Sequence, residues 1–596
     1  DLVLVRPGER LAVDGTVTEE WTLLEREPPG RAVWKIDFQI MEVERTFTLV
    51  AEGSQATRVS WRETGHIDNP LARYLKLAMG TEDVEANFDL ALEGLDAIVG
   101  DVVPKVRRDA YLERGPEVMD FIRDHSPVRF RWVPEYADYQ PEQPGGRARG
   151  RSVEPDPIDG RIIGEELTRL HPQYTKAPAN MVVLQRDFRK ISLGLRTLGG
   201  PITMLRVLLR RTLAGLRRQR LFGMGNAIAI GLRKALMDAG VPVLHEAELS
   251  ELVLSEGRVV GVKVLRDGTE HVVRARRGVV IGSGGFERNL EMREKYQPKP
   301  TSVDWTTGSQ FNTGGGISAG ITAGAEVALM DDSWWGPTIP LPSGPWFCLA
   351  ERNLPGSIIV NQAGKRYMNE ALPYVEATHK IYEGEATGVG HVPSWMVIDT
   401  RYRNRYLFAG LFPRQPFPGR WYKHGTIKRA STLAGLAEEI GVPAAALEAT
   451  VERFNGFARS GVDEDFGRGE SAYDKYYSDP TVKPNPSLGA IDQGPFYAVK
   501  IVPGDLGTKG GLVTDERARV LRPDGSPIEG LYAAGNASAA VMGHTYPGPG
   551  GTIGPALVFG YLAADDIAAS SVGRAGTSAS EERASRPHPN PESETV

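Results

Sequence analysis

The sequence has 596 residues, of which 41% are hydrophobic and 24% are charged, and its formal net charge is -6. These values are ordinary for a globular protein, and a negative balance gives no support to nucleic-acid binding. The single cysteine, Cys348, excludes an intramolecular disulfide and a thiolate metal cluster, which favours a reducing, cytoplasmic location. There is no apolar run of 18 residues and no signal peptide. Because residue 1 is Asp1, we expect the sequence to be part of a longer chain.

The first 67 residues or so show the alternation typical of antiparallel strands. From Ala32 to Ile40, apolar residues occupy every second position, which predicts a half-buried strand. Residues after Asn69-Pro70 then repeat apolar positions at helical spacing up to about residue 100. Strands followed by one long helix resemble the second half of a helix-grip domain of the polyketide cyclase/START type. The resemblance implies a partial α+β module over residues 1–100.

Two later segments predict helices with charged faces. Residues 101–122 form a charged amphipathic pattern, and residues 188–220 are rich in arginine and leucine. A basic amphipathic helix can lie on a membrane, so a weak membrane association is one interpretation of residues 188–220. A solvated helix face is the commoner explanation, and both stay open at this stage.

Residues 241–286 predict a compact β-rich segment. A short apolar strand over Pro242–Leu244 precedes a small meander with turns at Glu256-Gly257 and Asp267-Gly268. Gly278–Ile281 then predicts a buried strand, and it runs directly into Gly282-Ser283-Gly284-Gly285.

The last part of the chain repeats this arrangement of a strand followed by glycine. Helices such as Leu433–Glu439 are expected between residues 290 and 505, and Leu531–Ala534 predicts a strand that ends in Gly535-Asn536. The loop that contains Gly550-Gly551-Thr552-Ile553-Gly554 leads into a helix. Residues 571–596 are rich in Ser, Arg, Pro and Glu, and we predict that they are disordered.

Both glycine-bearing strand ends have the form expected of contacts with a flavin. A strand that ends in small residues lets its backbone pass close to a cofactor, because a Cβ atom would collide. The N–H groups of Gly550–Gly554, at a helix start, suit an anionic or carbonyl oxygen. Each feature alone also occurs in ordinary tight turns, but two of them some 250 residues apart in one chain are more specific.

From about Gly100 to about residue 570, the sequence resembles the 3-ketosteroid Δ1-dehydrogenases of the fumarate reductase/succinate dehydrogenase flavoprotein superfamily. The matching stretches include YADYQPEQPGGRARGRSVEP, MDDSWWGPTIPL, ERNLPGSIIVNQAGKRYMNEALPYVEA and GLYAAGNASAAVMGHTYPGPGGTIGPA. The resemblance implies an α/β fold with a split FAD-binding domain over residues 101–286 and 509–570. An α+β catalytic domain over residues 287–508 is inserted between the two parts.

The resemblance also implies a reaction, the 1,2-desaturation of a 3-ketosteroid. Hydride leaves C1 for the flavin N5, and a proton leaves C2. The positions that stabilise the C3 oxygen map to Tyr546 and Gly550, and the general base maps to Tyr374, although Tyr367 is a nearby competitor. Tyr139 maps to the tyrosine that hydrogen-bonds to the base and eases its deprotonation. A free tyrosine has a pKa of about 10, so it is a poor base without such help.

The remaining implied contacts line the substrate pocket or bind the cofactor. Flat apolar walls are expected from Tyr136, Phe347 and Trp335, together with Trp334 and Trp346, and Tyr136 could exchange roles with Tyr139. The expected partners are the 3-ketosteroid and an external electron acceptor, and the histidines and carboxylates show no metal-ligand spacing. The expected FAD contacts are Gly282, Gly284, Gly285, Ala247, Gly535, Asn536, Gly551, Thr552 and Ile553.

The sequence departs from the family in the segment that should hold the ADP half of FAD. Members begin with a βαβ unit that carries G-x-G-x-x-G, and residues 1–100 contain no such motif. We therefore expect the chain to fold poorly or to bind FAD weakly by itself. Glycine also stands in Asn312–Gly316 where the family often has an acidic residue.

Two other functions remain possible from the sequence. One is a different flavoprotein reductase of the same superfamily, although fumarate-type reductases rely on arginine and histidine rather than on a tyrosine-rich site. The other is an inactive flavoprotein remnant fused to a module that resembles a lipid-binding domain. Flavin content and binding of a 3-ketosteroid would separate these functions.

Overall fold

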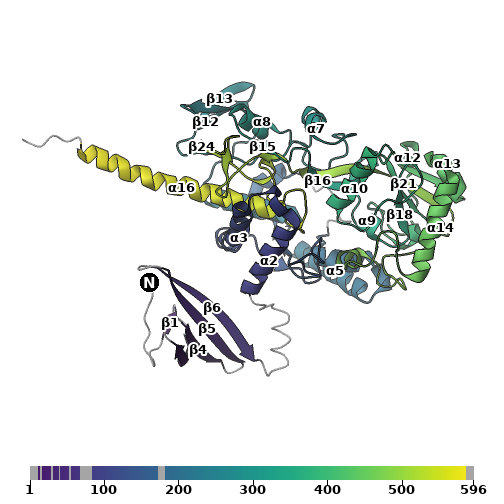
Figure 1. Cartoon of the computed structure of the whole chain (residues 1–596), viewed down its shortest axis with the longest axis horizontal. Helices are drawn as coiled ribbons and strands as arrows, with labels where there is room; N and C mark the ends of the chain where they lie inside the picture. Colours follow the sequence, from purple (N-terminus) through teal and green to yellow (C-terminus); the bar gives the residue numbers. More distant parts are fainter. Residues whose placement is uncertain are drawn as a thin grey trace, which may run out of the picture. The chain divides into compact units, whose positions relative to one another are not determined.

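The structure is a computed structural model of the chain. It describes the backbone of residues 11–13, 17–19, 21–27, 31–38, 41–52, 56–66, 84–171 and 181–584, and the side chains of residues 91–171, 181–194 and 196–570. The chain divides into two compact units, Asp1–Ala91 and Leu92–Val596. Figure 1 colours the chain along its sequence and labels its helices and strands.

The first unit contains antiparallel strands. β1 (Leu11–Val13) pairs with β2 (Val17–Glu19), and a four-stranded sheet follows in sequence order. β4 (Arg31–Phe38) covers the described part of the alternating segment that predicts a strand, so this prediction is confirmed. The helix expected after Asn69 lies partly outside the described residues, and α2 (Val84–Val99) forms its described end. The likeness to a helix-grip domain stays a prediction. The four strands are β3 (Trp21–Glu27), β4 (Arg31–Phe38), β5 (Met41–Glu52) and β6 (Ala56–His66).

A small sheet in the second unit carries the two glycine-bearing strand ends. β14 (Val279–Ile281) pairs in parallel with β24 (Pro527–Ala533), and β23 (Arg519–Leu521) lies on the other side of β24. In the described part of the chain, β14 is therefore an edge strand, and the Val280 side chain is 44% exposed. The strand predicted at Pro242–Leu244 is wrong, because this segment joins no sheet and the Leu244 side chain is 56% exposed. A strand buried on both faces needs a neighbouring strand, and the described residues provide none there.

The predicted meander is confirmed. β11 (Glu248–Ser255), β12 (Arg258–Arg266) and β13 (Thr269–Arg274) form an antiparallel sheet in that order. Gly257 (φ +80°) and Gly268 (φ +73°) adopt the left-handed backbone that its two turns require. The expected strand at residues 278–281 and the expected strand near residue 531 correspond to β14 and β24.

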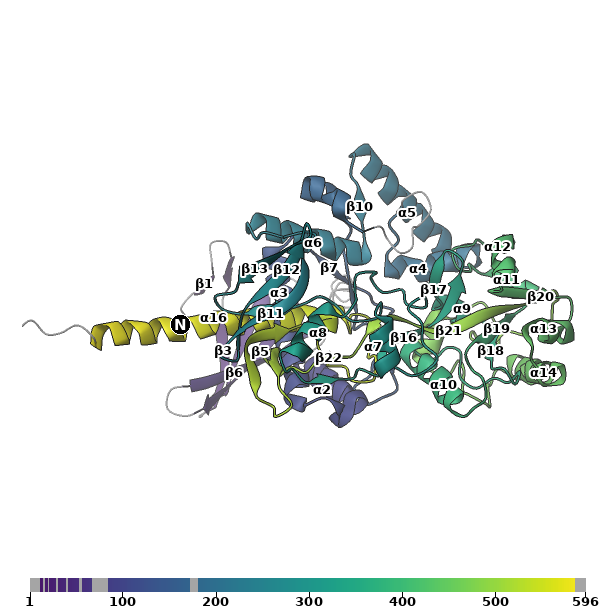
Figure 2. The same ribbon diagram turned by 90° about the horizontal axis from the view of Figure 1, so that it is seen from above.

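A larger mixed region forms the other half of the second unit. Its sheet has the order β17-β16-β21-β19-β18, and β20 also pairs with β21. In Figures 1 and 2, α9 to α14 gather around the β18, β19 and β21 end of this sheet. The strands are β16 (Ser333–Leu341), β17 (Gly344–Phe347), β18 (Ser357–Val360), β19 (Ser394–Ile398), β20 (Ile427–Ala430) and β21 (Phe496–Thr508).

Helices of the second unit form where the sequence predicts them. α3 forms where residues 101–122 predict a helix, and α13 begins after its cap, Thr432, whose side chain accepts a hydrogen bond from the Gly435 amide. The helices are α3 (Lys105–His125), α4 (Gln185–Ser192), α5 (Gly199–Leu216), α6 (Met224–Asp238), α7 (Leu290–Tyr296), α8 (Gly315–Thr322), α9 (Ala350–Asn353), α10 (Tyr374–Ala386), α11 (Thr400–Arg405), α12 (Gly419–Lys423), α13 (Leu433–Ile440), α14 (Ala444–Ser460), α15 (Ala472–Tyr477) and α16 (Ile553–Ala584).

The last helix is longer than expected. α16 extends to Ala584, and the predicted disorder of residues 571–596 stays a prediction. No proline occurs between residue 571 and Pro587, so the backbone can continue as a helix there. Residues 585–596 lie outside the described residues.

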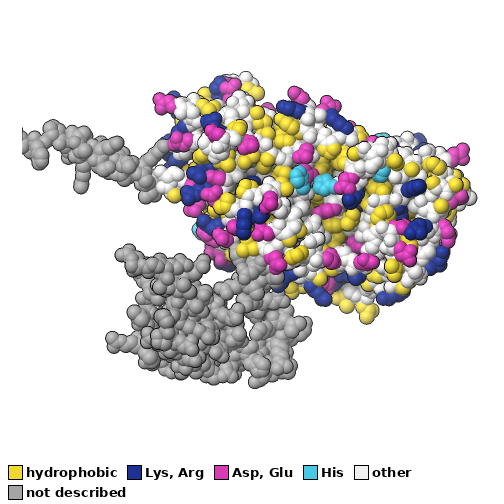
Figure 3. Space-filling view, viewed as in Figure 1, with side chains coloured by type: hydrophobic (Ala, Val, Ile, Leu, Met, Phe, Trp, Pro, Cys, Tyr) yellow, Lys and Arg dark blue, Asp and Glu magenta, His cyan; other side chains and the backbone are white. Residues whose placement is uncertain are grey.

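The described surface is mixed in charge. Figure 3 shows acidic and basic side chains interspersed over the drawn face of the second unit. Among the described residues, every helix is too short or too polar to span a lipid bilayer.

Candidate active site

The two glycine-bearing segments, far apart in sequence, leave the small parallel sheet at the same edge. Ile281 lies opposite Ala533, and the Ala534 N–H donates to the Ile281 carbonyl at 3.0 Å. The segments that begin at Gly282 and Gly535 therefore lie side by side at the carboxyl ends of β14 and β24. This is the edge where α/β sheets bind cofactors.

Different physical constraints explain why glycine occupies each position at this edge. A Cβ on Gly285 would lie 2.1 Å from Thr508 Oγ1, and one on Gly284 would lie 2.6 Å from Asn312 Oδ1, so packing requires both. Gly282 is exposed, and an added Cβ there would meet no described atom within 4 Å. The backbone at Gly282 is therefore open to a close ligand. Ala247 is half-buried just before β11.

The glycine-rich loop 547–552 brings free N–H groups to the same region. Gly535 lies against the first turn of α16, because a Cβ on Gly535 would be 3.3 Å from the Ala556 Cβ. Gly550 has a φ of +95°, and its carbonyl accepts the Gly554 N–H at 2.7 Å. Within the described residues, the Gly550 N–H donates to no acceptor. The Gly551 N–H donates to the Gly548 carbonyl at 3.2 Å. The first N–H groups of a helix lack intrahelical acceptors, so Thr552 and Ile553, at the start of α16, add donors here.

Three of the expected catalytic tyrosines form one buried cluster. The hydroxyls of Tyr139 and Tyr374 are 3.1 Å apart. The Tyr546 ring stacks on that of Tyr139, and its centroid is 5.2 Å from the Tyr139 and Tyr374 centroids. A Cβ on Gly551 would lie 3.6 Å from Tyr546 Cε1, so the Gly551 backbone lies close to the Tyr546 ring. The structure thus brings together the three tyrosines that the resemblance assigns to catalysis, and Gly550 directly precedes Gly551 in the chain.

Backbone contacts hold these side chains in place. The Tyr139 N–H donates to the Pro547 carbonyl at 3.0 Å, which ties the Tyr139 loop to the Tyr546 loop. Tyr374 is the first residue of α10, directly after Pro373, and proline before the first helical turn favours this start.

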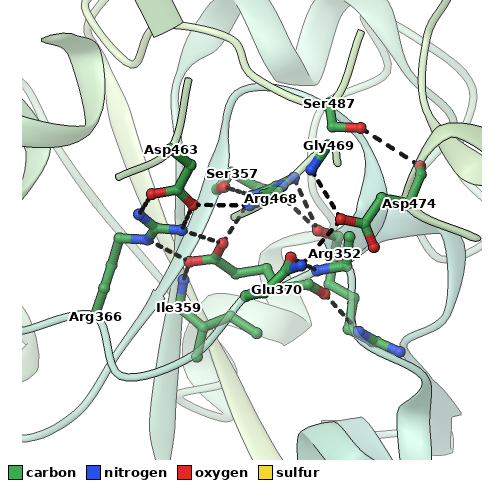
Figure 4. A network of polar contacts seen from close by, with 12 residues as sticks. Arg352, Ser357, Ile359, Arg366, Glu370, Asp463, Arg468, Gly469, Asp474 and Ser487 are labelled. Atoms are coloured by element: carbon green, nitrogen blue, oxygen red, sulfur yellow. Dashed lines mark hydrogen bonds and ion pairs between the residues drawn. The ribbon is translucent and has the colours of Figure 1, made fainter. Parts of the chain in front are cut away.

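A buried ionic network lies beneath the helix that carries Tyr374. Figure 4 shows Arg366 bonded to Asp463 and Glu370, and Glu370 bonded to Arg468. The distances are 2.9 Å for Arg366–Asp463, 2.8 Å for Arg366–Glu370 and 3.0 Å for Arg468–Glu370. Burial opposes ionisation, but the two arginines lower the pKa of Glu370. Removing one partner of such a pair costs about 3–5 kcal/mol, so the network fixes the segment just before Tyr374.

Burial controls the ionisation of the cluster. Loss of solvent raises the pKa of Tyr374 well above its ordinary value, and Tyr139 has the same shift for the same reason. Burial also raises the pKa of Tyr546, and interactions with the Tyr374 and Thr552 hydroxyls partly oppose this rise. Neutral hydroxyls that donate hydrogen bonds are therefore the resting form of this cluster.

Aromatic side chains surround the tyrosines, but not all of the expected ones. The Phe347 ring is 5.0 Å from the Tyr374 ring, and the Trp334 ring is 4.9 Å from the Tyr546 ring. Trp335 instead faces Tyr382 at 5.2 Å, because neighbouring residues of β16 point to opposite faces.

Two more of the expected positions lie away from the three tyrosines. Trp346 donates to Glu351 and packs against a separate core. Tyr367, the alternative base, bonds to Ser394 Oγ at 2.7 Å and packs against that same separate core.

Sequence reasoning missed the tyrosines of α15. Tyr136, expected to line the pocket, places its hydroxyl 2.5 Å from that of Tyr477. Tyr473 packs against Tyr139 and Tyr476 packs against Tyr136, with ring centroids 5.0 Å and 4.6 Å apart. The spacing of the three α15 tyrosines, i, i+3 and i+4, indicates one helix face and is the signal that could have found them.

A second buried polar cluster lies below the Tyr546 loop and was also missed. Asp332 Oδ2 lies 3.1 Å from Lys509 Nζ and 3.0 Å from His544 Nδ1, and Asp332 Oδ1 lies 3.0 Å from His379 Nε2. Burial opposes ionisation of Asp332, but these neighbours lower its pKa far below the usual value. The hydrogen bond with Asp332 in turn raises the pKa of His544. His544 is two residues before Tyr546, so this cluster holds the loop.

Asn312–Gly316, where glycine stands in place of the acidic residue common in the family, lies next to the Gly282–Gly285 segment. The Asn312 amide donates to Glu287 Oε1 at 2.6 Å, and Gly314 caps α8 with a φ of +78°. Glu287 lies two residues after Gly285, so Asn312 supports the end of the Gly282–Gly285 segment.

A parallel sheet edge lined by glycines, beside a helix start and a tyrosine cluster, defines a flavoprotein oxidoreductase. In agreement with this class, residues 46–553 match the model of a family described as FAD binding domain. FAD is therefore the cofactor.

Relatives with known names define the group more narrowly. The chain is 55% identical to the 3-oxosteroid 1-dehydrogenase of Mycolicibacterium smegmatis over 82% of this chain and 87% of that protein. It is 54% identical to the 3-oxosteroid 1-dehydrogenase of Mycobacterium tuberculosis strain H37Rv, over 80% of this chain and 86% of that protein. The chain belongs to the 3-oxosteroid 1-dehydrogenase family of FAD-dependent oxidoreductases.

A solved structure supports the same fold. The 3-ketosteroid Δ1-dehydrogenase of Sterolibacterium denitrificans, crystallised with 1,4-androstadiene-3,17-dione, matches with a TM-score of 0.78 and 41% identity. The match covers 81% of this chain and 89% of that chain.

Proposed function

We propose that this chain removes hydrogen from C1 and C2 of a 3-ketosteroid. The observation that supports this proposal best is the cluster of Tyr546, Tyr374 and Tyr139, against which the loop that carries Gly550 and Gly551 packs. A C2–H bond beside a ketone becomes acidic only when charge on the C3 oxygen is stabilised. Tyr546 and Gly550 donate hydrogen bonds to that oxygen.

Tyr374 takes the proton from C2, and Tyr139 positions its hydroxyl. FAD, when bound, would supply the hydride acceptor for C1, and an external electron acceptor is the expected second partner. Phe347 and Trp334 provide flat apolar walls for the rings of the steroid, which exclude water from the charge that develops on the C3 oxygen.

The cofactor contacts are assigned to backbone groups at the sheet edge. A Cβ added at Gly282 would meet open space, and the N–H groups of Thr552 and Ile553 lie at the start of α16. Gly551 contributes its backbone, since its N–H donates to the Gly548 carbonyl. Gly284, Gly285, Ala247, Gly535 and Asn536 complete the proposed FAD contacts. The residues present therefore fit the flavin half of FAD.

We expect the chain to bind the ADP half of FAD less tightly than the flavin half. Residues 1–100 lack G-x-G-x-x-G, and the free side of β14 leaves Val280 exposed among the described residues. We therefore propose that the chain by itself holds FAD loosely. The purified protein is expected to show little absorbance at flavin wavelengths until FAD is added, and a protein purified with one FAD per chain would contradict this proposal.

A different reductase of the superfamily is the second candidate for the reaction. The tyrosine cluster favours desaturation of a ketone over reduction of a dicarboxylate, because tyrosine hydroxyls match a single carbonyl oxygen rather than two carboxylates.

A weak association with membranes is also proposed, and it depends on α5. Ile202, Leu205, Leu209, Leu213 and Leu216 are all exposed and recur at spacings of three and four, so they form one apolar stripe along the helix. Arginines flank the stripe, and they suit the negative headgroups of an anionic membrane.

The direct test is turnover with 4-androstene-3,17-dione, the 1,2-saturated form of the steroid bound to the Sterolibacterium enzyme. With added FAD and a redox dye, the expected result is dye reduction with formation of the 1,4-diene, detected by mass spectrometry. Reduction of fumarate without oxidation of the steroid would favour the second candidate.

A further inference from the structure

Asp332 is held by the large sheet at the end of two paired strands. It directly precedes β16, and Lys509 directly follows β21. The ladder between these antiparallel strands ends at the pair Ser333–Thr508. Asp332 and Lys509 are the next residues outward, and the Lys509 N–H donates to the Asp332 carbonyl at 3.1 Å. Their buried side chains form an ion pair of 3.1 Å. The Asp332 carboxylate therefore projects from a rigid element.

Two further contacts of this carboxylate reach the two elements that carry the proposed chemistry. His379 Nε2 lies 3.0 Å from Asp332 Oδ1, and His544 Nδ1 lies 3.0 Å from Asp332 Oδ2. His379 belongs to α10, five residues after Tyr374, so the two move together as parts of one helix. His544 is two residues before Tyr546. One carboxylate thus binds both the helix of the proposed base and the loop of the proposed C3-oxygen donor.

Lys509 extends these contacts to the aromatic wall of the site. Its ammonium group lies over the Trp334 ring, 5.1 Å from the centroid, and that ring packs edge-on against Tyr546. The Trp334 N–H donates to Asn536 Oδ1 at 3.1 Å. The face of an indole ring attracts a cation, so Lys509 helps to fix the orientation of Trp334 beside Tyr546.

The charge of Asp332 strengthens each link. Burial opposes its ionisation, but Lys509 and the hydrogen bonds with the two histidines lower its pKa far below the usual value. An ionised carboxylate only accepts hydrogen bonds, so His379 Nε2 and His544 Nδ1 donate to it. Hydrogen bonds to a charged acceptor are stronger than those between neutral groups. The links to α10 and to the Tyr546 loop therefore resist displacement of either element.

We propose that Asp332 is a positioning residue for the desaturation. It holds α10, through His379, and the Tyr546 loop, through His544, at the separation that the reaction needs. This inference rests on the proposed function. C2 and C3 of the steroid are bonded to each other, so the base and the oxygen donor must reach two neighbouring positions at the same time. A misplacement of about 1 Å can lower a rate by about 10²-fold, so a small drift between the two elements is costly.

The test removes one link at a time at the two histidines. Their side chains are 31% and 44% exposed, so substitution there leaves the core intact. His379→Leu and His544→Leu remove the links. His379→Gln keeps an N–H donor near the position of Nε2, and His544→Asn keeps one near the position of Nδ1. His424→Leu is the matched control, since His424 Nδ1 bonds to Thr426 Oγ1 at 2.8 Å, outside this cluster.

Two rates are measured on the full chain with added FAD and 4-androstene-3,17-dione. The first is steroid oxidation with a redox dye, which gives kcat and KM. The second is exchange of C2 hydrogen in D2O, followed by NMR without the dye, because exchange needs the base and the C3-oxygen site but no net oxidation. Apolar walls hold the steroid, so loss of a link should lower kcat and the exchange rate about tenfold or more and leave KM within about twofold.

The conservative and double variants make the inference specific. His379→Gln and His544→Asn should restore both rates towards those of the wild-type chain, and the control should equal the wild type. Because both links set one separation, the double variant His379→Leu, His544→Leu should fall by less than the product of the two single effects.

Wild-type values of kcat in both leucine variants would overturn the inference and leave the proposed function intact. Failure of the glutamine and asparagine variants to restore the rates, or single effects that multiply in the double variant, would also overturn it. A wild-type chain that neither oxidises the steroid nor exchanges its C2 hydrogen would instead overturn the proposed function.

Discussion

Glu287, next to the Gly282–Gly285 segment, provides a quantitative test of the structure. Its side chain is fully buried, and Oε1 accepts the Asn312 amide at 2.6 Å. Burial raises the pKa of Glu287 from 4.5 to about 7, and the nearby charge of Asp505 adds to the rise. Glu287→Gln keeps the shape and the acceptor for Asn312 but cannot ionise.

The sign and size of the effect follow from the two pKa values. Below pH 4.5 the carboxyl group is neutral in both the folded and the unfolded chain, and its contribution to stability is fully present. Between pH 4.5 and about 7 the unfolded chain loses the proton first, so the folded chain is progressively destabilised. A shift of about 2.5 pH units corresponds to about 3 kcal/mol, at 1.36 kcal/mol for each unit.

The assay is urea unfolding of the wild-type chain and of Glu287→Gln at several values between pH 4.5 and 8.5. The difference in free energy of unfolding between the two proteins cancels the other titrating groups. This difference should shift in favour of the variant by about 3 kcal/mol across that range. A difference that stays constant with pH would refute the assignment of Glu287 as a buried group that remains protonated.

Three further predictions concern catalysis, pH and membranes. Tyr374→Phe should lower the turnover number of 4-androstene-3,17-dione oxidation by about 10²–10⁴-fold with little change in KM, and an unchanged turnover number would exclude it as the base. In Asp332→Asn, His544 loses the partner that raises its pKa. The stability that the wild-type pair contributes below about pH 6.5 is lost as the pH rises through the raised pKa of His544, so unfolding should differ more between wild type and variant at pH 6 than at pH 9. The double variant Ile202→Gln, Leu209→Gln should sediment less with anionic vesicles than the wild-type chain, and equal sedimentation would speak against α5 as the contact.

Local patterns were sufficient to predict the elements to which we assign the cofactor and the ketone. Short apolar runs that end in glycine predict β14 and β24, because both the strand and its close approach to a ligand are encoded in neighbouring residues. The Tyr546 loop and the N-terminus of α16 were predicted for the same reason. That these elements lie near Tyr374 and Tyr139 was predicted from the resemblance to the family and not from a local sequence pattern.

Features that depend on tertiary neighbours could not be predicted. Pro242–Leu244 has the composition of a strand, but a strand needs a partner, and composition does not supply one. Trp334 and Trp335 are adjacent tryptophans that sequence alone cannot distinguish. Because successive side chains of β16 point to opposite faces of the sheet, Trp334 contacts Tyr546 and Trp335 contacts Tyr382. Tyr477 is 341 residues from the tyrosine to which it bonds, so no local signal links them.

The central claim is that one C3 oxygen site and one tyrosine base remove a proton from C2 while hydride leaves C1. The most direct measurement uses 4-androstene-3,17-dione deuterated separately at C1 and at C2, with the FAD-loaded chain and without oxygen. The account predicts that flavin reduction slows with either label, that the C1 deuterium is found on the reduced flavin before it exchanges, and that the C2 deuterium appears in water. Flavin reduction that is insensitive to both labels, or C2 deuterium on the flavin, would contradict it.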